Sequence, residues 1–263
     1  MPAQRLALVT GASSGIGRAT ALLLGARGWR VVLVARSEAK LSAVRDRVVD
    51  AGGDAHVEVV DAGDADAVLA MADRVRDRLG VPGAIVNCAG LGQWKFMEDT
   101  PPDEMEAMLA APFKAAYHVT YAFLRDLLDQ GAGVIVHVGS PASVAPWPGT
   151  TGYAISRWAL RGLHESLAID LHGTGVHSCH VVFGEVSSEY WDHNPGTAEG
   201  KPTIERFLPA ITPEETAEVI VRTIDRPRPE VFHPPVIRAL ALSHRVVPGA
   251  TRWLLRRTGK RRG

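Results

Sequence analysis

Short runs rich in Val, Ile and Leu recur along the chain, and a segment with helical periodicity separates each run from the next. The runs lie at 6–9, 31–34, 57–60, 84–86, 134–138 and 176–183. A strand that is apolar on both faces is typical of a parallel sheet covered by helices on both sides. Because right-handed crossovers join such strands, the sequence predicts an α/β fold, a doubly wound parallel sheet of about seven strands with helices on both faces.

The first run leads directly into a glycine-rich turn and then into a helix. The turn is Gly11-Ala12-Ser13-Ser14-Gly15-Ile16-Gly17, and the helical pattern continues to Gly28, which suits a left-handed cap. Glycines let the backbone approach a pyrophosphate, whose charge is attracted by the N–H groups and the dipole at the start of the helix. The spacing differs from the commoner G-x-G-x-x-G dinucleotide motif. The turn therefore favours a dinucleotide, with a ligand-free turn as the alternative.

Composition indicates an ordinary globular protein with one domain. The chain has 263 residues, of which 46% are hydrophobic and 22% charged. Cys88 and Cys179 lie in apolar segments without disulfide or metal spacing, and no pair among the 10 histidines has a convincing zinc spacing. No signal-peptide pattern and no run of about 18 apolar residues occurs. We therefore expect no metal site, a reducing compartment and a cytoplasmic location.

The formal net charge of +0 hides a basic C-terminus. Residues 222–263 hold 11 Lys or Arg but only two acids, Asp225 and Glu230. We predict a basic C-terminal extension over 226–263 that packs on the main domain or on a partner. Its stretch 251–257 sets Trp and Leu among arginines, which suits weak peripheral binding to an anionic membrane. Docking into a neighbouring subunit explains the apolar residues equally well, and nucleic acid is not expected because the basic residues lack an accompanying fold or aromatic platform.

Two helix starts are clear in the sequence. Thr100 and Thr212 each precede proline and have an acid three residues on, at Asp103 and Glu215. A threonine cap with proline in the first turn is typical of a helix N-terminus. We predict helices that begin after both threonines, and a helix break at Pro248-Gly249.

Several motifs, in order along the chain, together resemble the short-chain dehydrogenase/reductase family. They are the 11–17 turn, Asn87-Cys88-Ala89-Gly90, Ser140, Tyr153-x-x-x-Arg157 and the 183–188 segment. The similarity covers roughly residues 5 to 225, and the order and spacing make it far more specific than one glycine run. It implies a Rossmann-like domain over 1–225 with a substrate lid at about 185–210, and a homodimer or homotetramer.

The resemblance implies where a dinucleotide would lie. It places the pyrophosphate over the 11–17 turn, the adenine beside Asp61, the nicotinamide-side ribose near 87–90 and the carboxamide near Val186 and Ser188. The predicted cofactor-binding residues are Gly11, Ser13, Ser14, Gly15, Ile16, Gly17, Arg36, Asp61, Asn87, Ala89, Gly90, Tyr153, Arg157, Gly184, Val186 and Ser188.

Arg36 favours one of the two nicotinamide cofactors. An acid at the end of the second strand would accept hydrogen bonds from a ribose 2′-OH, whereas an Arg accommodates a 2′-phosphate. The chain has Ala35-Arg36-Ser37 there, and a guanidinium can contact a phosphate through two hydrogen bonds. We therefore predict NADP(H), with Arg18 in a supporting role. A solvated loop cation is the alternative for Arg36.

In the family a Tyr, a Ser, a Lys and an Asn carry the reaction, and this chain departs at two of these positions. Tyr153 has the Tyr position, and Ser140 precedes it at the family's usual interval, with Ser143 as the local rival. Arg157 stands where the Lys is expected. Its charge would still stabilise a tyrosinate, but a guanidinium has no acceptor and cannot relay a proton. The predicted catalytic residues are Tyr153, Ser140 and Arg157, and a plain helix face is the alternative for the 153/157 pair.

The Asn position of the family falls on Ala111 or Pro112. A proline inside a helix removes a hydrogen bond and bends the axis. Because the resemblance implies a local distortion at this point, Pro112 would keep the bend and remove the side chain.

The expected reaction is the interconversion of a ketone and a secondary alcohol with NADP(H). Aromatic residues in the 185–210 segment and in 93–97 and 146–148 favour an apolar small molecule as substrate. The lid residues in question are Tyr190, Trp191, His193, Pro195, Pro202 and Phe207. The alternative is a cofactor-binding family member with little or no catalysis, acting as a sensor or interaction partner, because the Lys and Asn positions are changed.

Overall fold

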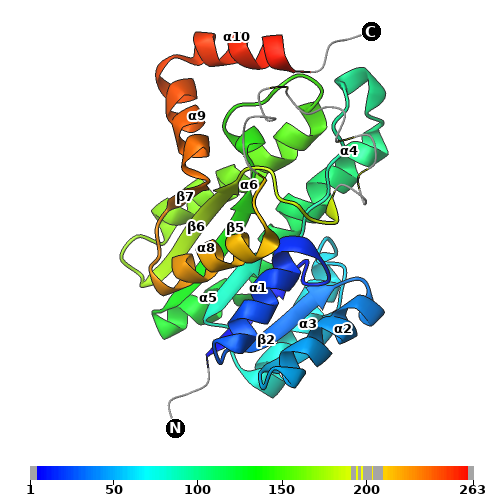
Figure 1. The fold of residues 1–263 in the computed structure, drawn as a ribbon. Helices are drawn as coiled ribbons and strands as arrows, with labels where there is room; N and C mark the ends of the chain where they lie inside the picture. Colours follow the sequence, from blue (N-terminus) through cyan, green and yellow to red (C-terminus); the bar gives the residue numbers. More distant parts are fainter. Residues whose placement is uncertain (1–4, 191–193, 195–196, 198–202, 204–209, 260–263) are drawn as a thin grey trace.

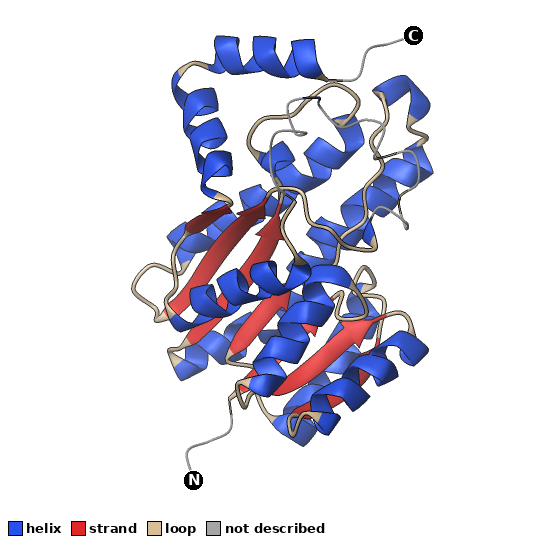
Figure 2. Ribbon diagram, in the orientation of Figure 1, coloured by secondary structure: helices blue, strands red, loops and turns tan. Residues whose placement is uncertain are grey.

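Seven parallel strands form one continuous sheet (Figures 1 and 2). The computed structural model describes residues 5–190, 194, 197, 203 and 210–259. The strand order is β3-β2-β1-β4-β5-β6-β7, which confirms the predicted doubly wound sheet. The strands are β1 (Leu6–Thr10), β2 (Arg30–Ala35), β3 (Asp54–Val59), β4 (Ala84–Asn87), β5 (Gly133–Gly139), β6 (Val176–Phe183) and β7 (Glu230–His233).

The strand β1 lies inside the sheet and pairs with β2 on one side and β4 on the other. The chain therefore reverses its direction of travel across the sheet between β3 and β4. In doubly wound folds the ligand crevice opens beside this switch point, at the carboxyl ends of the strands. Thr10, the last residue of β1, is in register with Val34 of β2 and Asn87 of β4, so these strand ends meet at one edge.

Helices cover both faces of the sheet (Figure 2). On one face lie α1 (Gly15–Ala26), α2 (Glu38–Asp50) and α8 (Pro213–Asp225), and on the other α3 (Ala65–Leu79), α5 (Ala115–Gln130) and α6 (Thr151–Asp170). The strands are apolar throughout because successive residues face opposite layers: Ala7 and Val9 join the first core, Leu6 and Leu8 the second. The predicted left-handed cap after α1 is confirmed at Gly28, whose φ is 77°.

Shorter helical elements follow β4 and β5. They are η1 (Met97–Asp99), α4 (Pro102–Leu109), the π-helical turn η2 (Ala110–Lys114) and the 3-10 turn η3 (Pro141–Ser143). The cap predicted at Thr100 is wrong, because α4 begins after Pro101 and the Thr100 hydroxyl donates to the carbonyl of Phe96 at 2.9 Å. The cap predicted at Thr212 is confirmed. Its hydroxyl accepts from the Glu215 N–H at 3.1 Å, and the Glu215 carboxylate accepts from the Thr212 N–H at 2.7 Å.

The C-terminal segment belongs partly to the sheet. The predicted extension over 226–263 contributes β7, which pairs with β6. From β7 the chain continues into α9 (Pro235–Val246) and α10 (Pro248–Thr258), which lie beyond the carboxyl ends of the strands (Figure 1). The predicted break at Pro248-Gly249 is confirmed. None of the described helices combines the length and apolarity that crossing a bilayer requires.

Candidate active site

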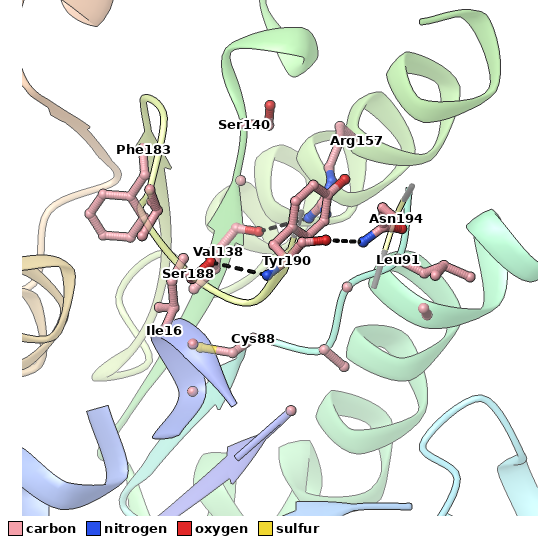
Figure 3. Close-up of a pocket in the computed structure, with 18 of the residues that line it drawn as sticks. Ile16, Cys88, Leu91, Val138, Ser140, Arg157, Phe183, Ser188, Tyr190 and Asn194 are labelled. Atoms are coloured by element: carbon pink, nitrogen blue, oxygen red, sulfur yellow. Dashed lines mark hydrogen bonds between the residues drawn. The ribbon is translucent and has the colours of Figure 1, made fainter. Parts of the chain in front are cut away.

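A cavity of about 910 Å³ opens at the carboxyl ends of the central strands (Figure 3). Every residue predicted for the cofactor or for catalysis lines this cavity, except Asn87 and the supporting Arg18. The lining residues come from the turn before α1, the end of β2, the loop after β4, the end of β5, α6 and the segment after β6. The fold thus brings together motifs that are far apart in the sequence.

The turn between β1 and α1 is so tight that its glycines cannot be replaced without strain. Gly11 and Gly15 have φ values of 64° and 49°, in the left-handed region. A Cβ on Gly17 would lie 2.3 Å from the carbonyl oxygen of Gly11, and a Cβ on Gly11 would lie 3.0 Å from the backbone of Ala89. The Ser14 side chain makes no capping bond to α1. The close backbone approach and the start of α1 therefore fit a pyrophosphate.

A carboxylate of the chain itself binds at this anion site. Glu189 accepts a hydrogen bond from the Gly15 N–H at 3.2 Å, and its other oxygen pairs with the Arg18 guanidinium at 2.8 Å. Burial opposes the charged form, but hydrogen bonds from backbone N–H groups and from Arg18 hold the pKa of Glu189 below its usual range. Arg18, expected beside the cofactor, has Glu189 as its partner. The sequence carries no signal for this contact, since Gly15 and Glu189 lie 174 residues apart.

The end of β2 brings positive charge to the cavity. Arg36, Ser37 and Lys40 line the cavity there, and the Arg36 side chain is exposed. Asp61 lines it after β3 and accepts a hydrogen bond from the Gly63 N–H at 2.9 Å. The two cations, Arg36 and Lys40, and the Ser37 hydroxyl suit the 2′-phosphate of NADP(H) better than the uncharged ribose 2′-OH of NAD(H).

Tyr153 and Arg157 lie one turn apart on α6 and contact each other. The Cζ atom of Arg157 lies 5.0 Å from the centroid of the Tyr153 ring, and each residue is only 6% exposed. Two glycines after β4 make room for them. A Cβ on Gly90 would lie 2.9 Å from the guanidinium, and a Cβ on Gly92 would lie 2.3 Å from the Tyr153 ring. The 153/157 spacing therefore builds a contact inside the cavity rather than a plain helix face.

The buried guanidinium of Arg157 has few partners. One amino group donates to the carbonyl of Val138 at 3.3 Å, and Nε has no partner among the described residues. No ion pair to Arg157 occurs in the described part of the chain either. A buried cation without a counter-charge is costly, so this position is suited to receive polar or anionic atoms of a ligand.

Of the two candidate serines, Ser140 is the one that lines the cavity. Its Oγ accepts a hydrogen bond from the Ala142 N–H at 3.3 Å and caps η3. The Ser143 hydroxyl instead donates to the backbone carbonyl of Ser140 at 2.6 Å. The hydroxyl of Ser143 is therefore engaged within the loop.

The helix is distorted at the position where the family has its Asn, as the sequence predicts. Ala110–Lys114 form the π-helical turn η2 between α4 and α5, and the buried Pro112 lies within it. Ala110 and Ala111 line the cavity. Of the two predicted positions, Ala111 therefore borders the cavity and contributes only a methyl group.

Comparison with known proteins agrees with this geometry. The family model described as short chain dehydrogenase matches residues 5–197. The chain belongs to the short-chain dehydrogenase/reductase family. Short-chain dehydrogenases are oxidoreductases that use NAD(P) as a cofactor.

Two curated relatives illustrate the similarity of this short-chain dehydrogenase to known proteins. The probable oxidoreductase EphD of Mycobacterium tuberculosis is 33% identical over 259 residues, which cover 94% of this chain but 44% of EphD. This chain thus spans less than half the length of that relative. A short chain dehydrogenase of Pseudocercospora fijiensis is 32% identical, over 87% of this chain and 78% of the relative.

Solved structures extend the comparison. An alcohol dehydrogenase from the archaeon Thermococcus sibiricus, in complex with 5-hydroxy-NADP, is 27% identical with a TM-score of 0.76, over 87% of this chain and 95% of that one. A metagenomic short-chain oxidoreductase in complex with NADP is 31% identical with a TM-score of 0.73, over 87% and 96% of the two chains.

Asn87 is the last residue of β4 and directly precedes Cys88, Ala89 and Gly90, which line the cavity. Its side-chain nitrogen donates to Thr120 Oγ1 at 3.4 Å and lies 3.3 Å from His137 Nδ1, inside the layer between sheet and helices. Asn87 is buried and does not line the cavity. These contacts give the Asn87 side chain a structural role at the end of β4, and the predicted contact with the ribose stays a prediction.

His137 also belongs to a buried histidine cluster that the sequence analysis misses. It consists of His137 from β5, His164 from α6 and His180 from β6. The rings of His164 and His180 stack at 5.5 Å. Burial, the largest cause, lowers the pKa of His137 to about 3 and that of His164 to about 4, and it also holds the pKa of His180 well below its usual value. All three histidines are therefore neutral near pH 7.

Aromatic residues line the cavity around Tyr153. Trp94 lies between Trp147 and Tyr153, with ring centroids 5.1 and 5.8 Å away. The Tyr190 hydroxyl donates to the carbonyl of Gly92 at 3.2 Å. Burial, and then the neighbouring Tyr153, raise the pKa of Tyr190, so it remains a neutral phenol. This part of the cavity suits an apolar ligand.

The predicted lid is tied to the loop after β4 through Asn194, whose hydrogen bond to Tyr190 is drawn in Figure 3. Its side-chain oxygen accepts from the Gly92 N–H at 3.2 Å, and its amide nitrogen donates to the Tyr190 carbonyl at 2.7 Å. The helices α9 and α10 complete the cavity wall, which the sequence analysis does not anticipate. They contribute Val236, Ile237, Leu240, Leu254 and Leu255. The other predicted lid residues, Trp191, His193, Pro195, Pro202 and Phe207, lie outside the described residues.

Proposed function

We propose that this chain is an NADP(H)-dependent oxidoreductase that interconverts a ketone and a secondary alcohol on an apolar substrate. The observation that carries the proposal is the contact of Tyr153 with the buried guanidinium of Arg157, which lacks a counter-ion among the described residues. A phenol beside a fixed cation is suited to proton transfer, because the cation stabilises the phenolate that the transfer leaves behind.

NADP(H) is proposed as the cofactor because of the charge at the end of β2. Arg36 and Lys40 line the cavity there and would hold the 2′-phosphate. The glycine turn and the start of α1 would hold the pyrophosphate, and Val186 and Ser188 the carboxamide. The NADP and 5-hydroxy-NADP complexes of the two solved relatives support this choice.

We assign separate roles in the reaction to Tyr153, Ser140 and Arg157. When bound, NADPH supplies a hydride to the carbonyl carbon. Tyr153 donates its hydroxyl proton to the carbonyl oxygen, which becomes the alcohol, and Ser140 donates a hydrogen bond to the same oxygen. Arg157 stabilises the tyrosinate and, through its remaining N–H groups, would hold the ribose hydroxyls. In the opposite direction the tyrosinate accepts the proton of the alcohol.

An apolar substrate is proposed because of the side chains nearest Tyr153. Trp94 packs on the Tyr153 ring, and Trp147 packs on Trp94. Leu254 and Leu255 of α10 line the same cavity. Burying apolar surface against such a wall contributes about 25 cal/mol per Å².

Turnover of a panel of aliphatic and aromatic ketones with NADPH tests this function. Tyr153→Phe should lower turnover by about 10²-fold to 10⁴-fold and change NADPH affinity far less, because only one hydroxyl of the cofactor site is removed. Arg157→Lys should raise turnover, because an amine can both donate and relay a proton, whereas Arg157→Met should weaken NADPH binding. Arg161→Lys is the matched control on the next turn of α6. Arg161 pairs with Glu165 and Glu230 instead of lining the cavity, so turnover should not change.

A second candidate function is a cofactor-binding sensor without turnover. Ala111 favours it, because a methyl group borders the cavity where the family has a polar side chain for proton relay. The sensor predicts NADPH binding but no turnover in the wild type and in Arg157→Lys. Absence of NADPH binding in a fluorescence titration would contradict both functions.

A further inference from the structure

The last two helices have an inner face that lines the cavity and an outer face that is apolar and exposed. Leu240 of α9 and Leu254 and Leu255 of α10 belong to the inner face. On the outer side Val246 is 77% and Trp253 56% exposed. Two further large apolar residues, Leu242 and Val247, are exposed beside them. Adjacent exposed apolar side chains of this kind mark an interaction surface.

The same two helices carry only positive charge. No Asp or Glu occurs from Val231 to Gly263. The basic residues of this stretch are Arg238, Arg245, Arg252, Arg256, Arg257, Lys260, Arg261 and Arg262. Within the described ranges no arginine of α9 or α10 forms an ion pair, whereas surface arginines elsewhere, such as Arg76 and Arg161, do.

The cations and the apolar side chains lie together on α10. The Arg257 guanidinium stacks over the Trp253 ring, with its Cζ 5.2 Å from the centroid. Arg252 and Arg256 line a groove of about 650 Å³ together with Trp158. Tryptophan beside arginine is the combination that binds at the boundary between headgroups and acyl chains. The groove offers two guanidinium groups to a phosphate.

We propose that the outer face of α9 and α10 docks on an anionic lipid bilayer. The cations would contact phosphate headgroups, and Trp253, Val246 and Val247 would enter the interfacial region. Each basic residue near such a surface contributes about 1 kcal/mol, so binding is peripheral and sensitive to salt. The charge complementarity favours anionic lipid over a second copy of this chain, because a face without acids would meet the same cations on its partner.

Docking would place the substrate cavity at the lipid surface. The wall formed by Leu254 and Leu255 belongs to the same helix as Trp253, so an apolar substrate could pass from the bilayer to Tyr153 along α10. This consequence, unlike the docking itself, rests on the proposed function.

Co-sedimentation of the full chain with lipid vesicles tests the docking. We expect binding to vesicles of phosphatidylcholine with phosphatidylglycerol, little binding to phosphatidylcholine alone, and release as salt rises from about 0.05 M to about 0.5 M. Reversing two charges with Arg252→Glu and Arg256→Glu should weaken binding at least about tenfold. Val247→Glu should weaken it as well. Val49→Glu, on α2, is the matched control, because the two valines are 52% and 51% exposed.

Two further measurements separate the alternatives. NADPH titration of the same variants should be unchanged, which shows that they fold and keeps the docking test apart from the test of the proposed function. Light scattering should give the same mass for Val247→Glu and the wild type. Equal binding to neutral vesicles, no vesicle binding, or a smaller assembly in Val247→Glu would overturn the proposal, and the last result would identify the face as a subunit interface.

Discussion

At the scale of single residues, the Glu189 carboxylate competes with any phosphate that approaches the start of α1. It accepts the Gly15 N–H and neutralises Arg18. Glu189→Gln keeps the shape but removes the negative charge. We therefore expect NADPH to bind about two- to fivefold more tightly to the variant, the effect of a partly exposed ion pair. Fluorescence titration gives the two dissociation constants.

Glu218→Gln provides the control for this measurement. The Glu218 carboxylate accepts a hydrogen bond from the Arg27 guanidinium at 2.6 Å, at the opposite end of α1. The Glu218→Gln variant should therefore have the same NADPH dissociation constant as the wild type. An equal or higher dissociation constant for Glu189→Gln would show that Glu189 does not compete with the cofactor.

Residue contacts were predictable where they follow from local spacing. Tyr153 and Arg157 lie four positions apart on a helix, so their contact can be predicted from the helical repeat without knowing the rest of the fold. Glu189 reaches Gly15 only because the segment after β6 returns to α1, and periodicity carries no information on that path. For Asn87 the motif was recognised in the sequence, but the sequence did not show that its side chain bonds to Thr120 in the protein interior.

At the scale of elements, the packing of α6 against β5 and β6 makes the fold sensitive to acid. The pKa values of His137 and His164 are about 3 and about 4 in the folded chain and 6.5 in an exposed site. The unfolded chain therefore binds more protons below pH 6.5, so the stability from neutral histidines is complete above that pH and lost as the pH falls. We expect the free energy of unfolding to fall between pH 6.5 and about 5 by up to about 1.4 kcal/mol per pH unit for each histidine.

Urea unfolding at a series of pH values measures this dependence. His164→Gln should make the slope shallower by about one proton. His177→Gln alters an exposed residue of β6 and should keep the wild-type slope. The slope, rather than the absolute stability, is the readout, because any change in the core lowers stability. A wild-type slope in His164→Gln would refute the assignment.

The elements that escaped the sequence analysis lack the signals it depends on. The strand β7 has only four residues, all of them half-buried, so it forms no apolar run. Thr100 has the sequence of a cap, but its hydroxyl bonds back to Phe96 and the helix starts later. The inner face of α10 could not be assigned, because its apolar residues suit a membrane, a partner or the cavity wall equally well.

At the scale of the whole molecule, the layer of α5 and α6 has an apolar outer side. Tyr117, Tyr121, Ile155 and Ile169 are exposed there, on one side of each helix. We propose that this layer joins copies of the chain in a homodimer or homotetramer, since exposed apolar patches mark interfaces. Light scattering should then give a mass of two or four times 28.2 kDa.

The double variant Tyr121→Glu, Ile169→Glu should reduce the mass to that of the monomer. Leu69→Glu changes an exposed apolar residue of α3, on the same face of the sheet but outside the proposed α5 and α6 interface, and should leave the assembly intact. A wild-type mass of 28.2 kDa would refute the proposed assembly.

The position of Leu254 and Leu255 after the last strand of the sheet affects biogenesis. The sheet is complete at His233, so the glycine turn, Tyr153 and Arg157 can be in place before α10 has been synthesised. Because domains tend to fold as they emerge from the ribosome, a nascent chain would gain the ability to hold a nucleotide first. The substrate part of the cavity would close only when α10 folds back, so a nascent chain that lacks α10 could bind nucleotide without turning over substrate.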